Sequence, residues 1–538
     1  MKRDQFNVLV ESMKGKDTTH GWDVVVSYDE DKINDFLEAH PISAIESLPP
    51  FRGTGHDEDD SGQVVAREYE FDIKLRSPKL QFIGKHGRAK LDFTITGTYK
   101  RHASSSGSVN QLPDGYQASI AAELYNVLGA LNKAGGNGQF IASPSSHRSG
   151  PNNATDVQLN SARGVYLSLK EPEVHFQPQG GKISSAAKDA LRDGLRNYLQ
   201  QGTQEYLIAG VAGYDTDPSM IAIRPTRFCF TVTPKDEDGT PGFLSMWIGV
   251  EGGHKNGLQP SGMTTLAFQP GGTTYRSPIP SQTSASIIFS HDIMAGLFLK
   301  PNLEGFLDDV KVTSFPGTGG MEFTGCLKHP GVKIPAQDTK KDIDYRETEI
   351  THYDGFNFTV TTPPATVTVK PGITTSSEDA ILVSYKSKPE TSEWSVNYKA
   401  TEWASPPKSG AVSATLSWKA KGQWTAGTQA RPNLIGLTMT PDQNWSLNAS
   451  ETDHSNFFTK WANKINGGVD VPGHYEGLQP PAVFNLTMRA LDYFLTTNLL
   501  FPGRQMFKAH LPVASAHANE KGLAVPRDLI LTGDITSS

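Results

Sequence analysis

The spacing of oxygen-bearing side chains between positions 57 and 68 fits a calcium-binding loop. Five residues fall at positions one, three, five, six and twelve of such a loop: Asp57, Asp59, Ser61, Gly62 and Glu68. Carboxylate and hydroxyl oxygens bind calcium, the glycine permits the sharp turn, and the last glutamate can bind through both oxygens. The motif also needs flanking helices, but Pro49 and Pro50 precede it and Glu68 belongs to a strand pattern. An acidic surface loop is therefore the preferred interpretation, and calcium is the alternative.

A second candidate site is a group of cations in a turn predicted between two strands: Lys85, His86, Arg88 and Lys90. Exposed amides and cations at a turn can bind the phosphate of a lipid headgroup. We therefore take Lys85, Arg88 and Lys90 as headgroup candidates. The alternative is a solvated hairpin tip whose charges prevent edge-to-edge association.

A third candidate is the apolar stretch around Ser290. The run Ile287-Ile288-Phe289 predicts a strand that enters a helix, with Ser290 as its N-cap and Asp292 at the positive end of the helix dipole. This helix has almost no polar face, so protein or an apolar ligand must cover it. It is too short and too interrupted to span a bilayer. Three of its residues are candidates for lining an acyl groove: Ile293, Leu297 and Phe298. Ordinary core packing is the alternative.

Common catalytic and nucleotide-binding motifs are absent from the sequence, which has no G-x-S-x-G, H-E-x-x-H, P-loop or G-x-G-x-x-G pattern. Scattered His, Ser and Asp residues remain, but a catalytic triad is defined by its arrangement in space. We therefore expect a protein that is not an enzyme and needs no cofactor.

Composition excludes several classes of partner. The chain has 538 residues, with 50 basic and 57 acidic side chains, and 50 − 57 gives a net charge of −7. This balance gives no basic footprint for nucleic acid and no general attraction to anionic membranes, so any peripheral membrane contact is local. Cys229 and Cys326 are too few for a disulfide framework or a cysteine metal site, which fits a reducing compartment.

The N-terminus begins Met1-Lys-Arg-Asp, and no apolar run of signal-peptide length follows. No later stretch reaches transmembrane length. We therefore expect synthesis in the cytoplasm, no transmembrane segment, and a non-classical route for any release from the cell.

Strands and helices predicted from periodicity surround these candidates. Gly21 to Tyr28 predicts a strand that leads into a helix from Asp29 to His40, and Ser27 and Glu30 have the spacing of a capping box. Leu48 to Asp60 predicts a turn-rich acidic loop. Two strands follow in which apolar and polar residues alternate, with these apolar positions: Tyr69, Phe71, Ile73 and Leu75, then Leu91, Phe93, Ile95 and Tyr99.

Two further amphipathic helices are predicted. One begins at a cap at Ser184 or Ser185 and ends before Gly202, and the other begins near Asp453. Strands are predicted for Ile221 to Pro234 and for Phe243 to Val250, and the sequence beyond residue 340 is rich in strand patterns.

The spacing of the four helices predicts a duplicated architecture. Ser27 and Ser185 are 158 residues apart, and Ser290 and Asp453 are 163 residues apart. Each half would contain a strand, a helix, a run of antiparallel strands and a second helix. A curved antiparallel sheet with an apolar inner face can roll around such helices. The predicted fold class is α+β, mostly antiparallel β, with two modules: residues 1–270 and residues 271–538.

Four stretches carry a resemblance to a known family: Thr19-His-Gly-Trp-Asp-Val-Val-Val with the following Lys32-Ile-Asn34, Ser290-His-Asp-Ile-Met-Ala-Gly-Leu-Phe-Leu-Lys-Pro301, Asn498-Leu-Leu-Phe-Pro502, and Val525-Pro-Arg-Asp-Leu-Ile-Leu-Thr-Gly533. From one end to the other, the chain resembles the accessory proteins of clostridial neurotoxin loci, of the OrfX and forty-seven-kilodalton types. The resemblance implies a tubular lipid-binding (TULIP-like) fold, with two tandem elongated super-rolls in which a curved sheet wraps long helices and leaves a groove for acyl chains. Some members of the family recognise phosphoinositide lipids.

Two functions follow as hypotheses. The first is a non-enzymatic protein that binds a lipid or another hydrophobic ligand, with phosphoinositides implied by the resemblance. The second is a protein-interaction component of a toxin complex, whose modules are packed solid and which docks onto companion toxin-cluster proteins. A bound lipid would distinguish the first from the second.

Overall fold

The structure is a computed structural model, and it describes the residues in the following ranges: 3–39, 48–84, 87–102, 108–131, 140–142, 150–159, 161–177, 183–201, 205–213, 223–237, 239–253, 267–270, 276–304, 307–314, 321–327, 332–334, 337–343, 347–353, 356–358, 364–370, 381–387, 390–396, 398–400, 408–425, 436–441, 446–453, 485–487, 494, 499–501, 506–510, 522–524 and 526–536.

The chain divides into two compact units. Unit 1 comprises Met1–Ile293, Ala426–Ile435 and Met488–Ser538, and unit 2 comprises Met294–Thr425 and Gly436–Thr487. This division differs from the expected modules 1–270 and 271–538, because the C-terminal residues fold with the N-terminal half. The pairing responsible is that of β13 (Ala285–Phe289) with both β1 (Val24–Asp29) and β31 (Leu529–Thr536).

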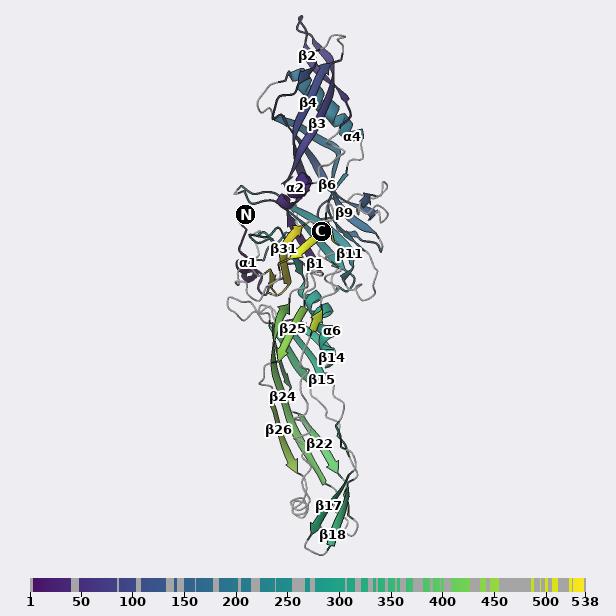
Figure 1. Cartoon of the computed structure of the whole chain (residues 1–538), viewed down its shortest axis with the longest axis vertical. Coiled ribbons are helices and arrows are strands. Elements are labelled where there is room, and N and C mark those ends of the chain that lie inside the picture. Colours follow the sequence, from purple (N-terminus) through teal and green to yellow (C-terminus); the bar gives the residue numbers. More distant parts are fainter. Residues whose placement is uncertain are drawn as a thin grey trace. The chain divides into compact units, whose positions relative to one another are not determined.

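Sheet A of unit 1 has the antiparallel order β29-β31-β13-β1-β12-β11-β8, with β30 paired to β31. Its strands β1, β11 and β31 are labelled in Figure 1. Its remaining strands have these bounds: β8 Thr155–Asp156, β11 Pro225–Thr233, β12 Phe243–Val250, β29 Met506–Ala509 and β30 Leu523–Ala524. Every residue of β1, β12 and β13 is buried. The strands predicted at Gly21 to Tyr28, Ile221 to Pro234 and Phe243 to Val250 are therefore confirmed in outline.

Sheet B of unit 1 has the antiparallel order β2-β3-β4-β6-β9-β10-β28, with β5 paired to β4 and β7 paired to β6. Its strands have these bounds: β2 Phe51–Glu58, β3 Val64–Ile83, β4 Arg88–Arg101, β5 Asn110–Gln111, β6 Gln117–Leu131, β7 Phe140–Ala142, β9 Ala162–Gln177, β10 Glu205–Ala212 and β28 Leu499–Leu500. The predicted alternation in β3 is confirmed, because Phe71, Ile73 and Leu75 are at most 1% exposed. In β4, Leu91, Phe93 and Ile95 are likewise buried.

The loop predicted from Leu48 to Asp60 is wrong for most of its length, because Phe51–Glu58 forms strand β2. The inward positions after Phe51 are Gly53 and Gly55, which face helix α4 (Ser185–Gln201). A Cβ atom on Gly55 would lie 1.8 Å from the Ala186 carbonyl oxygen. Glycine is required here because β2 and α4 approach each other backbone to backbone.

Helix α4 contacts both β2 and β9, which have three strands between them in sheet B. The helix lies beside β2, β3 and β4 in Figure 1. Contact with two strands so far apart in the order requires the sheet to curve around the helix. The predicted cap and apolar stripe are confirmed: Ala187 N–H donates to Ser184 Oγ at 3.2 Å, and Leu191, Leu195 and Leu199 are fully buried.

Helix α2 (Glu30–Ala39) follows β1 as predicted, but its cap differs from the prediction. Asp29 Oδ1 accepts the Lys32 N–H at 2.9 Å and is the N-cap. Ser27 lies within β1, where its hydroxyl meets Ser245 Oγ at 2.7 Å, so the capping box of Ser27 and Glu30 is wrong. A first helix, α1 (Phe6–Met13), precedes β1 in a segment for which no element is predicted.

The central helix begins as predicted, because Ile293 N–H donates to Ser290 Oγ at 3.4 Å. It consists of α5 (His291–Ile293), the π-helix η2 (Met294–Leu299) and α6 (Lys300–Leu303). Pro301 has no N–H to donate to the carbonyl four residues earlier, and its ring crowds that carbonyl. A widened π turn before Pro301 is one way in which a helix accommodates such a residue.

Unit 2 contains a nine-stranded antiparallel sheet with the order β14-β15-β20-β21-β24-β25-β27, with β22 and β26 also paired to β24. The other described strands of unit 2 form a pair, β16-β19, and a triplet, β17-β18-β23. The bounds are β14 Leu307–Ser314, β15 Met321–Leu327, β16 Val332–Ile334, β17 Gln337–Ile343, β18 Glu347–Tyr353, β19 Phe356–Phe358, β20 Pro364–Lys370, β21 Ile381–Ser387, β22 Glu390–Val396, β23 Tyr398–Ala400, β24 Lys408–Thr425, β25 Gly436–Pro441, β26 Ser446–Asp453 and β27 Asn485–Thr487. The β-rich class is confirmed. Asp453 ends strand β26, and the helix predicted to follow it lies outside the described residues.

Candidate functional site

Three of the four stretches that carry the family resemblance meet at the centre of sheet A. The strands β1, β13 and β31 are neighbours: β1 contains part of the first stretch, β31 contains part of the last, and β13 leads directly into the second at Ser290. Asp528, which belongs to the last stretch and lies directly before β31, has a buried carboxylate that binds His291 of the second stretch and Thr18, the residue before the first. It accepts the Thr18 N–H at 2.8 Å, the Thr18 hydroxyl at 2.7 Å and the His291 N–H at 3.0 Å.

The Asp528 cluster connects segments that are distant in the sequence. His291 is 8% exposed, with Nε2 3.2 Å from Asp292 Oδ1 and Nδ1 3.9 Å from Asp528 Oδ1. Burial raises the pKa of Asp528, and the two hydrogen bonds from Thr18 act in the opposite direction. The arrangement therefore fits a structural connection between chain segments.

The stretch Lys32-Ile-Asn34 has a comparable structural role at the edge of sheet B. The Asn34 amide donates to the Leu80 carbonyl at 2.9 Å and accepts the Leu80 N–H at 2.6 Å. Glu30 Oε2 accepts the Phe82 N–H at 3.0 Å. Helix α2 therefore satisfies backbone groups of β3 beyond the segment that pairs with β2, which protects an exposed strand edge.

A row of buried hydroxyls crosses sheet A, and sequence reasoning missed it. The register aligns five residues of β11, β12, β1, β13 and β31: Thr231, Ser245, Ser27, Ser286 and Thr532. Each is at most 5% exposed. Trp247 Nε1 donates to Thr231 Oγ1 at 2.9 Å, whereas Ser286 Oγ is buried and has no hydrogen-bond partner among the described residues. Only the cross-strand register reveals the row, because its members lie far apart in the sequence.

The N-terminal segment runs along this hydroxyl-bearing face. Arg3 Nη2 contacts Asp29 Oδ2 at 2.9 Å at one end, and Thr18 binds Asp528 at the other. Asp29 shares a face with Ser27, and Asp528 shares a face with Thr532, because alternate residues of a strand point to the same side. Helix α1, which lies between Arg3 and Thr18 in the sequence, therefore covers part of this face.

The serines of the row provide a stability test. We expect Ser286→Ala to leave the free energy of unfolding unchanged or to raise it by about 1 kcal/mol, because it removes a buried hydroxyl that has no partner. Ser27→Ala should cost about 1 to 2 kcal/mol, because Ser245 loses its partner. Urea denaturation of both variants checks this contrast. Equal losses for the two variants would show that the Ser286 hydroxyl is satisfied in solution.

A Ser, His, Asp trio does occur at the opposite end of β31, but its geometry does not fit a nucleophile. Ser284 Oγ donates to Asp534 Oδ1 at 2.8 Å, and His510 Nε2 lies 2.9 Å from Asp534 Oδ2. The serine hydroxyl thus faces the carboxylate, with no contact to the imidazole that would act as base.

The residues of the predicted calcium loop are not brought together. Asp57 lies in β2, the turn begins at Asp59, and Glu68 lies in β3 opposite Thr54. From Val64 to Glu68 the strand extends about 13 Å, at about 3.3 Å per residue. Within the described ranges no group of three or more His, Cys, Asp or Glu side chains could hold a metal ion.

Asp59 instead organises a hairpin turn. Its Oδ1 accepts the Ser61 hydroxyl at 2.6 Å, the Ser61 N–H at 2.9 Å and the Gln63 N–H at 3.0 Å. These hydrogen bonds, the Ser61 hydroxyl foremost, lower the pKa of Asp59. The carboxylate is already used by the turn, which agrees with the preferred interpretation of an acidic surface loop.

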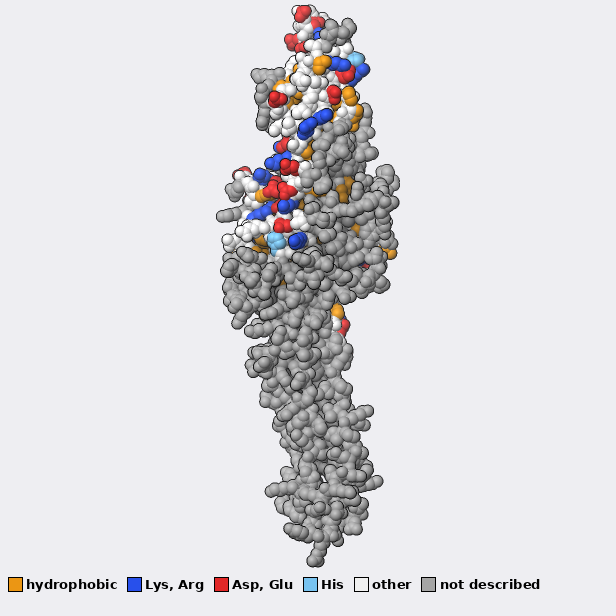
Figure 2. All heavy atoms as spheres, viewed as in Figure 1, with side chains coloured by type: hydrophobic (Ala, Val, Ile, Leu, Met, Phe, Trp, Pro, Cys, Tyr) orange, Lys and Arg blue, Asp and Glu red, His pale blue; other side chains and the backbone are white. Residues whose placement is uncertain are grey.

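Two of the headgroup candidates, Arg88 and Lys90, lie on β4, and Lys85 lies outside the described residues. Lys90 Nζ contacts Asp92 Oδ2 at 3.0 Å. The outer face of β3 adds three exposed cations for which the described residues provide no ion-pair partner: Lys74, Arg76 and Lys79. Acidic and basic side chains are interspersed over this part of unit 1 (Figure 2).

The three groove candidates occupy the central helix. Ile293, the last residue of α5, is fully buried, and Leu297 in η2 is half-buried. Phe298 also belongs to η2, but its side chain lies outside the described set. Their role in lining a groove stays a prediction. No described helix is both long enough and apolar enough to span a membrane.

Comparisons with known proteins were made at the levels of sequence and structure. No family model matches the chain, and no curated protein matches it. Among solved structures, P47 from Clostridium botulinum A2 is similar with a TM-score of 0.46 and 10% identity, covering 96% of this chain and 98% of that one. P47 of Clostridium botulinum E1 has a TM-score of 0.49, 10% identity and coverages of 96% and 100%. A lipopolysaccharide binding protein has a TM-score of 0.26, 10% identity and coverages of 96% and 99%.

The appearance of P47 among these structures agrees with the resemblance to the forty-seven-kilodalton type that the sequence predicts. Because the identity is 10% and the TM-scores are low, the function of the chain has to be argued from its own residues.

Proposed function

We propose that the chain binds a lipid or another apolar ligand, without covalent chemistry, in an interior enclosed by sheet B and α4. One observation carries the proposal: α4 contacts β2 and β9, which are separated in the sheet by β3, β4 and β6. A sheet curved in this way has an inner face that water does not reach. The finer form of the proposal is a TULIP-like roll in unit 1 and a second one in the C-terminal half.

The inner face has the chemistry that an acyl chain requires. Apolar side chains of β3, β4, β6 and α4 line it, and they include Ile73, Phe93, Ile95, Ala118, Ile120 and Leu195, each at most 2% exposed. Burial of each CH₂ group of a ligand would contribute about 0.8 kcal/mol. An interior of this kind selects for apolar length.

The most specific form of the proposal is that the bound lipid carries a phosphate headgroup, such as that of a phosphoinositide. The cations Lys74, Arg76, Lys79, Arg88 and Lys90 lie on β3 and β4, the strands whose inner face would hold the acyl chain. Guanidinium and ammonium groups bind phosphate strongly when several converge.

Native mass spectrometry of the gently purified protein, with extraction and identification of lipid, tests the proposal. We expect near-stoichiometric lipid in the natural chain and its loss in Ala118→Phe. Ala118 faces inward, opposite Phe93 of β4 and Phe176 of β9, so a ring at this position would occupy ligand space. Thr96→Phe places the same ring on the exposed face of β4 and should keep the lipid.

The same variants distinguish the interaction-component hypothesis. If the interior is packed solid, no lipid will be found after incubation with a mixed lipid extract. Ala118→Phe will then overpack the core and cost about 1 to 3 kcal/mol of unfolding free energy. That pair of results would reject the lipid proposal and direct attention to docking onto companion proteins.

A further inference from the structure

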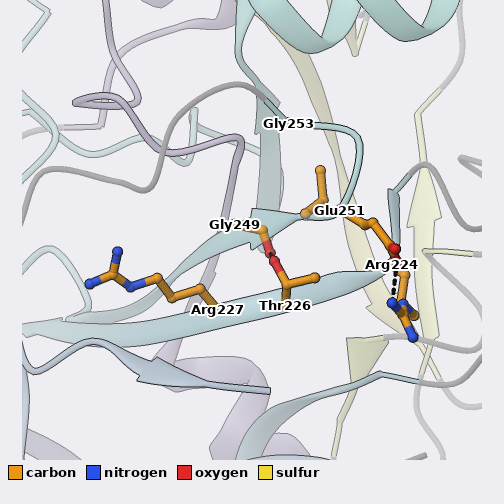
Figure 3. Close-up of a pocket in the computed structure, with 7 residues that line it drawn as sticks. Arg224, Thr226, Arg227, Gly249, Glu251 and Gly253 are labelled. Carbon is orange, nitrogen blue, oxygen red and sulfur yellow. Dashed lines mark hydrogen bonds and ion pairs between the residues drawn. The ribbon is translucent and has the colours of Figure 1, made fainter. Parts of the chain in front are cut away.

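A polar pocket lies in sheet A, at the end of the β11 and β12 pair. Its volume is about 250 Å³. Arginines, a threonine, glycines and one glutamate line it: Arg224, Thr226, Arg227, Gly249, Val250, Glu251 and Gly253 (Figure 3). A water molecule occupies about 30 Å³ of liquid, so the space exceeds that of a single bound water.

A bulge in β11 creates the opening. The register with β12 shifts between Pro225 and Arg227, which leaves Thr226 as the extra residue. The Thr226 hydroxyl donates to the Gly249 carbonyl at 3.2 Å. Bulges of this kind redirect side chains and often occur beside binding sites.

Arg224 provides a hydrogen-bond donor without an acceptor. Its Nη2 contacts Glu251 Oε2, and its side chain is 15% exposed. Its Nε atom is buried and has no hydrogen-bond partner among the described residues. A buried guanidinium N–H of this kind is an unsatisfied charged donor, which an oxyanion could satisfy.

The acidic groups near the pocket are already engaged. Glu251 is paired with Arg224, and Asp23 Oδ2 accepts the Val250 N–H at 2.9 Å. The Asp23 carboxylate lies so close to Gly253 that a Cβ atom there would be 2.0 Å from Asp23 Oδ2. A side chain at residue 253 would displace the Asp23 carboxylate, and with glycine the pocket keeps an open backbone wall on this side.

We propose that this pocket binds a phosphate-type oxyanion, with Arg224 as the principal donor. The Arg227 guanidinium points away from Arg224 (Figure 3) and lies over the Trp22 ring, 5.9 Å from its centroid. The ligand is either free phosphate or the phosphate of a lipid headgroup. The site is independent of the apolar interior of sheet B.

The first experiment measures the Arg Nε–H signals of the full chain by NMR during titration with inorganic phosphate. We expect one signal, absent from Arg224→Gln, to shift with saturation at about millimolar phosphate. Glu251→Gln should tighten binding several-fold, because it removes a carboxylate that competes for the same guanidinium. Arg52→Gln, at an exposed arginine of sheet B, should leave binding unchanged.

The second experiment distinguishes the two sources of phosphate. Vesicles that carry a phosphomonoester lipid are sedimented with each variant, beside neutral vesicles. Sedimentation that depends on Arg224 identifies a headgroup, and an NMR response without sedimentation identifies free phosphate. Absence of any Arg224-dependent response in both experiments overturns the proposal, whatever the outcome of the lipid test on Ala118→Phe.

Discussion

Asp528→Ala is expected to lower the free energy of unfolding by about 3 to 5 kcal/mol. The change leaves two backbone N–H groups, of Thr18 and His291, without an acceptor in a site that is 1% exposed. Each buried donor left in this way costs about 1 to 3 kcal/mol. The carboxylate also adds to the strand pairing that joins the three chain segments, and the variant loses that contribution. Urea denaturation followed by tryptophan fluorescence gives the value.

Asp534→Ala is the matched control, because Asp534 lies in β31 and also accepts hydrogen bonds. Its carboxylate is 33% exposed, so water can replace it as a partner for Ser284 and His510. We expect a loss of about 1 kcal/mol. A loss as large as that of Asp528→Ala would mean that burial is not what makes Asp528 important.

The pH dependence of the same site has a definite sign. Burial raises the pKa of Asp528 above its ordinary value, the Thr18 hydrogen bonds and Arg527 act to lower it, and Asp17 acts to raise it. A raised pKa in the folded state stabilises the protein below the unfolded pKa, and this contribution is lost as pH rises through the folded pKa. Asp528→Asn cannot acquire the buried charge. The natural chain should therefore lose stability relative to this variant as pH rises from about 3 to about 7, when urea midpoints are compared.

Strands were predictable from the sequence where one face is apolar. In β3, Phe71 and Ile73 alternate with charged residues, and burial follows the same alternation. Strand β2 was not predictable in this way, because its inward positions are Gly53 and Gly55. Glycine gives no hydrophobic signal, and its reason for being there is the approach of α4, which is distant in sequence.

Local motifs predicted two caps correctly and one wrongly. Ser184 and Ser290 cap their helices, whereas Ser27 points across a sheet to Ser245. The spacing of a capping box cannot show whether the serine lies before the helix or two residues further back in a strand. The calcium pattern was misleading for a similar reason. Its twelve residues would form a loop around an ion, but in the structure they extend along the hairpin of β2 and β3.

Local sequence patterns could not predict how the chain divides into units. The partners Ile288 and Ile530 in adjacent strands are separated by 242 residues, since 530 − 288 is 242. Nothing in either stretch alone indicates the other. The candidate sites could not be predicted from local patterns either. The cations of β3 and β4 lie on one face because of the register between the two strands, and the pocket at Arg224 depends on the bulge in β11.

Gly55→Ala is expected to lower the free energy of unfolding by about 3 kcal/mol or more. The added Cβ would lie 1.8 Å from the Ala186 carbonyl oxygen and 2.7 Å from its carbon, both of which belong to the backbone of α4. Overpacking a core costs about 1 to 3 kcal/mol when side chains can yield. Here neither β2 nor α4 can yield without a shift of the whole element. Gly150→Ala is the control, because its nearest neighbour would be 3.9 Å away, and it should change stability by less than about 1 kcal/mol.

The pattern of local unfolding in Gly55→Ala will also test how helix α4 is held against sheet B. If α4 is held mainly by its contact with β2, the variant will release it, and hydrogen exchange will accelerate in residues 185–201 while sheet A keeps its protection. The apolar inner face would then open to water, and a lipid bound within it would be lost. If exchange instead accelerates evenly in both sheets, α4 is an integral part of one cooperative unit. In that case a ligand would have to enter without displacement of the helix.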